Sequence, residues 1–164
     1  MKLKNNKGYV GIDASIAILV LLIIVPTLAG MIYNVNKSNN LIDRKTEAIS
    51  IAVNTIEAMK GIGIFDINDS NFNETVLTTS LSSLYTLDGN PTTEVVDNIK
   101  SIKGITLTKD KNTYQIQVDI QDYADTKEGK AKSVPLGKVK IVNVTVTFKS
   151  GKQTENIELS TVIS

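Results

Sequence analysis

A run of 23 residues without a charged side chain, residues 14–36, constrains this chain more than any other feature. As an α-helix the run would be about 35 Å long, enough to cross a bilayer core of about 30 Å. Residues 1–8 before it contain three lysines and no acidic residue. Because basic residues are retained on the cytoplasmic side, the sequence predicts a single membrane pass with the C-terminus outside.

The acidic residue at the start of this run, Asp13, bears on how the segment is used. An ordinary secretory signal would extend to Pro26 and be cut after Ala29, whereas a permanent signal anchor would keep the whole segment. In a third interpretation, a short leader is removed just before Tyr9. A carboxylate costs up to about 2.5–3.5 kcal/mol at mid-membrane and less near the interface. A plain signal peptide gains nothing from this cost, so Asp13 favours the third interpretation.

Residues 7–13, Lys-Gly-Tyr-Val-Gly-Ile-Asp, resemble the prepilin peptidase site of type IV pilins. In that family a basic residue and Gly precede the cut, and an aromatic residue, usually Phe, begins the mature chain. The fifth mature residue is an acid, usually Glu, and a long apolar helix follows. The resemblance implies cleavage between Gly8 and Tyr9, N-methylation of Tyr9, and a role for Asp13 in assembly.

The match departs from the family pattern in two respects. Tyr and Asp replace Phe and Glu, and the proline usual a little over twenty residues into the mature chain is absent. Pro26 lies earlier, and Gly30 is near the expected place. The resemblance implies other pilin subunits, the prepilin peptidase, an inner-membrane assembly platform and the lipid bilayer as partners. It also implies a single-pass cytoplasmic membrane protein that later joins an extracellular or periplasmic filament.

The helical pattern continues beyond the uncharged run. Apolar residues recur there at spacings of three and four: Leu41, Ile42, Ala48, Ile49, Ala52, Val53, Ile56 and Met59. This pattern predicts an amphipathic extension of the helix to about Lys60, with Gly61 and Gly63 as the stop. The whole helix, residues 9–60, would be about 78 Å long.

The rest of the chain predicts an antiparallel sheet. Apolar residues alternate over 105–107, 114–120, 142–148 and 157–163, with turns at Lys111-Asn112 and Ser150-Gly151. Residues 66–73 are loop-like, and two short helices are expected over 74–85 and 92–102. The apolar face of this four-stranded sheet needs a cover, which the helix over 41–59 can supply. The predicted fold is therefore α+β, a long N-terminal helix packed on four antiparallel strands, similar to the ladle fold of pilins. The predicted divisions are a leader (1–8), a transmembrane or filament-core helix (9–36) and a globular domain (37–164).

Composition argues against most catalytic chemistry. The chain has no His and no Cys, so the commonest general base, thiol nucleophiles and the usual zinc ligands are excluded. We expect no enzymatic activity and no cofactor, and the net charge of +1 gives no pull toward nucleic acid.

The remaining polar groups favour structural roles. Asp66, Asn68 and Ser70 are spaced like the start of a calcium loop, but Asn71 and Leu77 stand where that loop needs Gly and Glu. A polar turn is expected there instead of a metal site. The serines of the Ser/Thr-rich stretch have no His partner, and solvated charge is expected of the acids and lysines between 119 and 132. The first set is Ser80, Ser82 and Ser83; the second is Asp119, Asp122, Asp125, Lys127, Lys130 and Lys132.

The resemblance implies a structural subunit of a type IV pilus or of a type II secretion-like filament. The last two strands, ending at residues 159–164, resemble the C-terminus of some minor pilins and pseudopilins and favour that class. Two alternatives stay open, a major pilin and a membrane-anchored extracellular binding domain that does not polymerise. The polar connection over 121–138 is either a surface-contact segment or a solvated loop.

Overall fold

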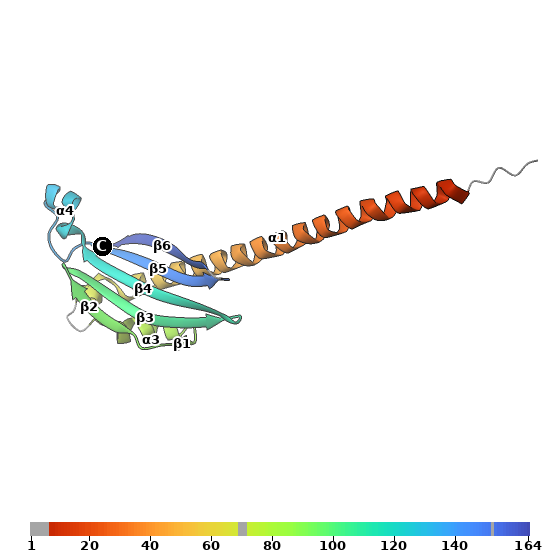
Figure 1. Cartoon of the computed structure of the whole chain (residues 1–164). Helices are drawn as coiled ribbons and strands as arrows, with labels where there is room; N and C mark the ends of the chain where they lie inside the picture. The colour runs from red at the N-terminus through yellow and green to blue at the C-terminus, as the bar shows by residue number, and fades with distance from the viewer. Residues whose placement is uncertain (1–6, 69–71, 152) are drawn as a thin grey trace, which may run out of the picture. The chain divides into compact units, whose positions relative to one another are not determined.

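A computed structural model of the chain describes residues 7–68, 72–151 and 153–164, with the backbone alone at 7–10, 65 and 68. The fold is α+β (Figure 1). The helices are α1 (Lys7–Ile62), α2 (Ile64–Asn68), α3 (Glu74–Ser82), the 3-10 helix η1 (Tyr123–Asp125) and α4 (Lys127–Ala131). The strands are β1 (Leu87–Asp88), β2 (Thr92–Val96), β3 (Ile99–Lys109), β4 (Asn112–Asp122), β5 (Lys140–Ser150) and β6 (Gln153–Ile163). The chain divides into two compact units after Ile42, and the second, Asp43–Ser164, is the folded domain described below.

The first helix, α1, is continuous from Lys7 to Ile62 although it contains Pro26. Proline lacks an N–H group and therefore removes one intrahelical hydrogen bond. The helix ends where Gly63 takes a φ of +83°, a conformation that costs glycine little. The long helix and its glycine stop are confirmed.

The sheet is antiparallel, with strand order β1-β3-β4-β5-β6 and with β2 also paired to β3. The predicted strands over 105–107, 114–120, 142–148 and 157–163 lie in β3, β4, β5 and β6. β5 runs to Ser150, which pairs with Gln153, so the β5–β6 turn includes Gly151 but not Ser150 of the predicted turn. The β3–β4 turn lies one residue before its predicted place, because Asp110 and Lys111 carry the positive φ angles of 47° and 68° that fit a two-residue type I′ turn.

The helix predicted over 92–102 is wrong, and the described sheet has six strands instead of four. β2 and the start of β3 form a hairpin in this region, with Val96 opposite Ile99. Its turn residues, Asp97 and Asn98, have φ angles of 51° and 63°, and these residue types tolerate the left-handed region better than most. The turn at Asp97 and Asn98 therefore prevails over the helix expected over 92–102.

A β-bulge explains how β3 pairs with two short strands on one edge. The register of β3 shifts between Ile102 and Ile105, where Gly104 has a φ of 80°. A Cβ at Gly104 would lie 2.6 Å from the carbonyl oxygen of Asn90. Only glycine allows this approach, which separates the part of β3 paired with β2 from the part paired with β1.

The core lies between the inner face of the sheet and a layer of helices. Tyr114, Ile116, Val118 and Ile120 of β4 and Val142, Val144, Val146 and Phe148 of β5 are buried. The rings of Tyr114 and Phe148 pack with centroids 5.9 Å apart. Burial contributes about 1.5–3 kcal/mol for each large side chain.

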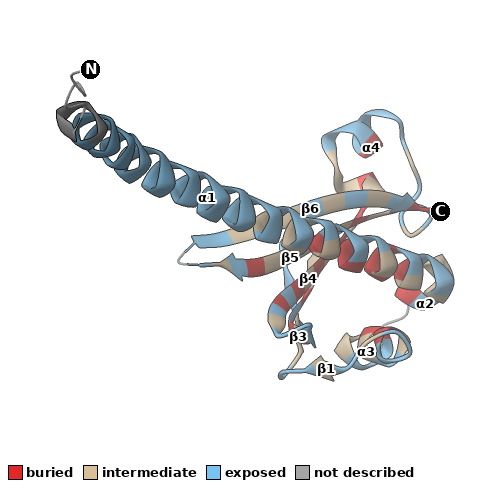
Figure 2. Ribbon diagram, turned by 90° about the vertical axis from the view of Figure 1, so that its right-hand side faces the viewer, coloured by how far each residue is buried: buried red, intermediate tan, exposed pale blue. Residues whose placement is uncertain are grey.

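The domain half of α1 buries one face against this core (Figure 2). That face consists of Ala48, Ile51, Ala52, Thr55, Ile56 and Met59. The expectation that Ile49 and Val53 would be buried is wrong, because they are 44% and 39% exposed. Each lies about 100° around the helix from a buried alanine, and the buried stripe is centred on those alanines. Thr55 is tolerated in it because its hydroxyl donates to the carbonyl of Ile51 at 2.8 Å.

The connection between β4 and β5 is held at its base by Asp122. Its carboxylate accepts hydrogen bonds from the Ala124 N–H at 3.0 Å and the Gly137 N–H at 2.7 Å, and pairs with Lys140 Nζ at 3.1 Å. Burial raises the pKa of Asp122, but these contacts outweigh it and bring the pKa below 3.8. The expectation of a solvated Asp122 is therefore wrong, since its side chain is only 9% exposed.

Candidate functional site

The membrane-span candidate is the N-terminal part of α1. From Gly11 to Asn40 every residue is exposed within the fold, and one stretch of this helix is long and apolar enough to cross a membrane. The hydroxyl groups of Ser15 and Thr27 donate to the carbonyls of Gly11 and Ile23, at 2.8 and 2.7 Å. These hydroxyl protons are therefore satisfied by the helix itself, as an apolar surrounding requires.

Asp13 is the one carboxylate in this part of the helix, between Gly11 and Asn40. It is exposed, and no described residue gives it a hydrogen bond or an ion pair. The predicted cleavage point, Gly8 and Tyr9, lies in the first turn of α1, but their side chains are outside the description, as are residues 1–6 of the predicted leader. Asp13 thus has no hydrogen-bond or ion-pair partner among the described residues.

Glu47 shows the opposite arrangement, an acid of α1 with two partners in the domain. Its carboxylate pairs with Lys109 Nζ at 2.6 Å and accepts a hydrogen bond from the Tyr114 hydroxyl at 3.1 Å. Burial, followed by the nearby Glu47 carboxylate, raises the pKa of Tyr114 to about 12. Lys45 adds an ion pair with Glu155 of β6 at 3.3 Å. These contacts fix residues 43–62 on the sheet and serve the fold.

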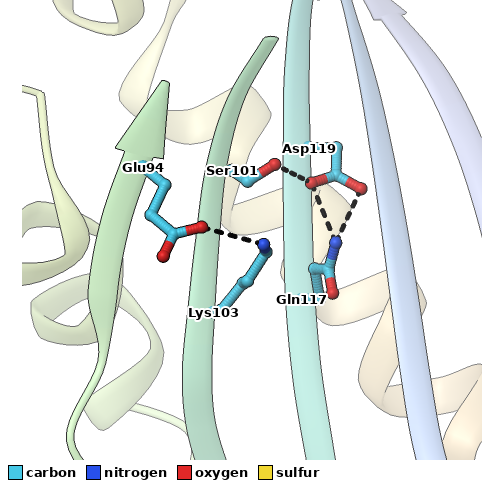
Figure 3. Close-up of polar contacts among 5 residues, drawn as sticks. All are labelled: Glu94, Ser101, Lys103, Gln117 and Asp119. Carbon is cyan, nitrogen blue, oxygen red and sulfur yellow. Dashed lines mark hydrogen bonds and ion pairs between the residues drawn. The ribbon is translucent and has the colours of Figure 1, made fainter. Parts of the chain in front are cut away.

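The outer face of the sheet carries a polar cluster around Asp119 (Figure 3). The Asp119 carboxylate accepts hydrogen bonds from the Ser101 hydroxyl at 2.5 Å and from the Gln117 amide at 3.1 and 3.0 Å. Beside it, Lys103 pairs with Glu94 at 3.0 Å. Asp119 was expected to be solvated. It is only partly so, because its carboxylate also accepts these three hydrogen bonds from side chains. The alternation of Gln115, Gln117, Asp119 and Gln121 in the sequence was the available signal.

The other polar groups considered from the sequence have local roles. The hydroxyls of Ser82 and Ser83 donate to the carbonyls of Thr79 and Ser80, at 2.7 and 2.8 Å. Asp66 lies in α2, where a loop was expected, and Ser70 lies outside the described residues. Over the described residues, no group of three or more His, Cys, Asp or Glu side chains could hold a metal ion.

Comparison with family models, curated proteins and solved structures finds no match to this chain.

Proposed function

We propose that this chain is a type IV pilin-like subunit, a minor pilin or pseudopilin by class, that assembles into a filament through α1. The observation that carries the proposal is Asp13, an acid without a partner among the described residues, in an otherwise uncharged stretch of helix. The α+β domain supports it, because an amphipathic helix half covering an antiparallel sheet is the general plan of the pilin ladle fold.

The proposed mechanism begins with removal of residues 1–8. The mature chain then starts with the α-ammonium of Tyr9, four residues before Asp13. In a single subunit Asp13 remains near the membrane interface, where water limits its cost. In a filament neighbouring helices exclude that water, so the carboxylate needs a cation, and the Tyr9 ammonium of an adjacent subunit supplies one. The pair offsets much of the desolvation of both groups and sets the axial register of the subunits.

The first test is the N-terminus of the mature protein, mapped by mass spectrometry. A chain that starts at Tyr9 supports the proposal, an intact Met1 indicates a non-polymerising anchor, and a start at Gly30 indicates ordinary secretion. Gly8→Val places a branched side chain at the cleavage point and should block processing. Processing of Gly8→Val at the wild-type rate would contradict cleavage by a prepilin peptidase.

The second test concerns assembly. Asp13→Asn keeps the shape but removes the charge, leaving the neighbouring ammonium unpaired at a cost of about 3–5 kcal/mol. We expect this variant to be inserted in the membrane yet nearly absent from sheared filaments of the native host. Asp13→Glu is the matched control and should assemble at least as well as wild type. Equal incorporation of Asp13→Asn would remove Asp13 from the mechanism.

A further inference from the structure

The outer face of the sheet contains a shallow hollow of about 360 Å³ above β3, β4 and β5. This volume is within the range of small-molecule sites. Val96 and Asp97 of the β2–β3 hairpin border it, and Asp119, Gln121 and Asn143 are among its lining residues. The hollow is distinct from the N-terminal helix and from the contacts that hold α1 on the sheet.

Asp119 gives this hollow an oriented hydrogen-bond acceptor. A carboxylate has about four lone-pair positions. The hydrogen bonds from Ser101 and Gln117 occupy two on Oδ1 and one on Oδ2. The carboxylate is thus held from two sides, and Oδ2 keeps one position for a ligand.

Asn143 places a hydrogen-bond donor beside this acceptor. It lies directly opposite Asp119 in the β4–β5 pairing, where facing Cβ atoms are about 4.5–5.5 Å apart. The Ser160 hydroxyl donates to its Oδ1 at 2.6 Å, which fixes the amide. Its Nδ2 group donates no hydrogen bond to any described residue. An acceptor and a donor therefore stand side by side in one hollow, each oriented by a serine on the neighbouring strand.

We propose that this hollow binds a pair of adjacent hydroxyl groups on a neutral sugar ring. One hydroxyl accepts from Asn143 Nδ2 and its neighbour donates to Asp119 Oδ2, since a hydroxyl can do either. Val96 is 62% exposed at the edge of the hollow and supplies an apolar contact for the C–H face of the ring. The hollow presents both signs of charge: Asp97 and Asp119 repel an anion, and Lys103, which pairs with Glu94 at 3.0 Å, repels an ammonium.

The test is an NMR titration of the full-length ¹⁵N-labelled chain in phosphocholine micelles, which carry no sugar headgroup. The probes are methyl glucoside and methyl 3-deoxyglucoside, because the second sugar has no adjacent pair of hydroxyls. We expect methyl glucoside to shift the amide signals of Ser101, Asp119 and Asn143 with a Kd on the order of 1–10 mM. The 3-deoxy sugar should bind at least about tenfold more weakly, since one of the two hydrogen bonds is lost.

Two variants locate the binding. Asn143→Ala removes the donor, and its control is Asn156→Ala on β6, outside the hollow. Asp119→Asn removes the charged acceptor, and its control is Asp88→Asn on β1. We expect about a tenfold loss of affinity in Asn143→Ala and Asp119→Asn, no change in the controls, and unchanged signals elsewhere in all four. The proposal is overturned if methyl glucoside causes no shift, if both site variants bind like wild type, or if N-methylacetamide shifts these signals and sugars do not. None of these readouts depends on filament assembly.

Discussion

Residues 11–42 and 43–62 belong to one helix but meet different surroundings. In the second stretch, Glu47 and Lys45 have partners on the sheet, and one face of the helix is buried. In the first, every residue from Gly11 to Asn40 is exposed and Asp13 has no described partner. The domain thus supplies the partners of residues 43–62, whereas no described residue covers the helix from Gly11 to Asn40. The two acids of this helix therefore differ: Glu47 has its partner within the chain, whereas Asp13 has none among the described residues.

The largest expected effect tests which face of the second stretch is buried. Ala52 is 0% exposed and its neighbour Val53 is 39% exposed. Ala52→Asp would bury an unpaired charge and should destabilise the domain by about 5 kcal/mol, enough to unfold many domains. Val53→Asp should cost less than about 1 kcal/mol. Thermal unfolding of the full chain in micelles, followed by circular dichroism, separates the two. Equal melting temperatures for these variants would contradict the helix orientation described here.

A smaller effect contrasts Gly129 of α4, in the folded domain, with Gly30 of the first stretch of α1. A Cβ at Gly129 would lie 1.8 Å from the carbonyl oxygen of Tyr123, whereas one at Gly30 would meet nothing within 4 Å. Gly129→Ala should therefore cost about 1–3 kcal/mol through backbone displacement. Gly30→Ala should be neutral or stabilising by about 0.5–1 kcal/mol in the unassembled chain. Chemical denaturation at one detergent concentration gives both values, and a stabilising Gly129→Ala would show that α4 lies less close to Tyr123 than described.

The smallest effect concerns the hydroxyl of Tyr114. Tyr114→Phe removes its hydrogen bond to Glu47 and should cost about 0.5–1.5 kcal/mol at neutral pH. Because the folded pKa is about 12 against 10 for a free tyrosine, the folded state favours the protonated hydroxyl. This stability is full below pH 10 and is lost as the pH rises to about 12. The pKa of Lys109 is also raised, by its hydrogen bond with Glu47. Its contribution to stability is therefore likewise lost as the pH rises.

Stability measured from pH 9 to 12 tests this linkage. The free energy of unfolding should fall more steeply with pH in wild type than in Tyr114→Phe. The variant keeps the contribution of Lys109 but lacks that of the Tyr114 hydroxyl. A Tyr123→Phe variant is the control, because the hydrogen bond of the Tyr123 hydroxyl with Glu128 is exposed. Parallel curves for wild type and Tyr114→Phe would remove Tyr114 as a source of the alkaline loss.

The sequence predicted the parts of the fold in which one residue pattern dominates. β4, β5 and β6 follow from strict alternation, and α1 follows from its length and its glycine stop. The β2–β3 hairpin was missed because Val95 and Val96 are both exposed, so this short edge strand has no alternating burial. Asp97-Asn98, between β-branched residues, was the signal that favoured a turn.

The errors at Val53 and Asp122 have the same physical cause: whether each side chain is buried depends on strands that are distant in the sequence. The spacing of apolar residues predicts which side of a helix is apolar but not where the buried face is centred. Val53 was therefore expected to be buried and Thr55 was not. Asp122 looks solvated in the sequence because its partner Lys140 and its donor Gly137 come 15 or more residues later. The role predicted for Asp13 depends on local sequence alone, since the lack of nearby charge is a local property, and it stays a prediction.

The closed base of the β4–β5 connection has a consequence for how this protein can diversify. Asp122 and Lys140 are directly paired across the two strands, so the segment between them leaves and re-enters the sheet at one point. Residues added or lost near the exposed Lys132 would change neither the register of β4 and β5 nor the core beneath them. Selection can therefore remodel this surface in length and charge while the scaffold stays constant, much as antibody loops vary on a fixed framework.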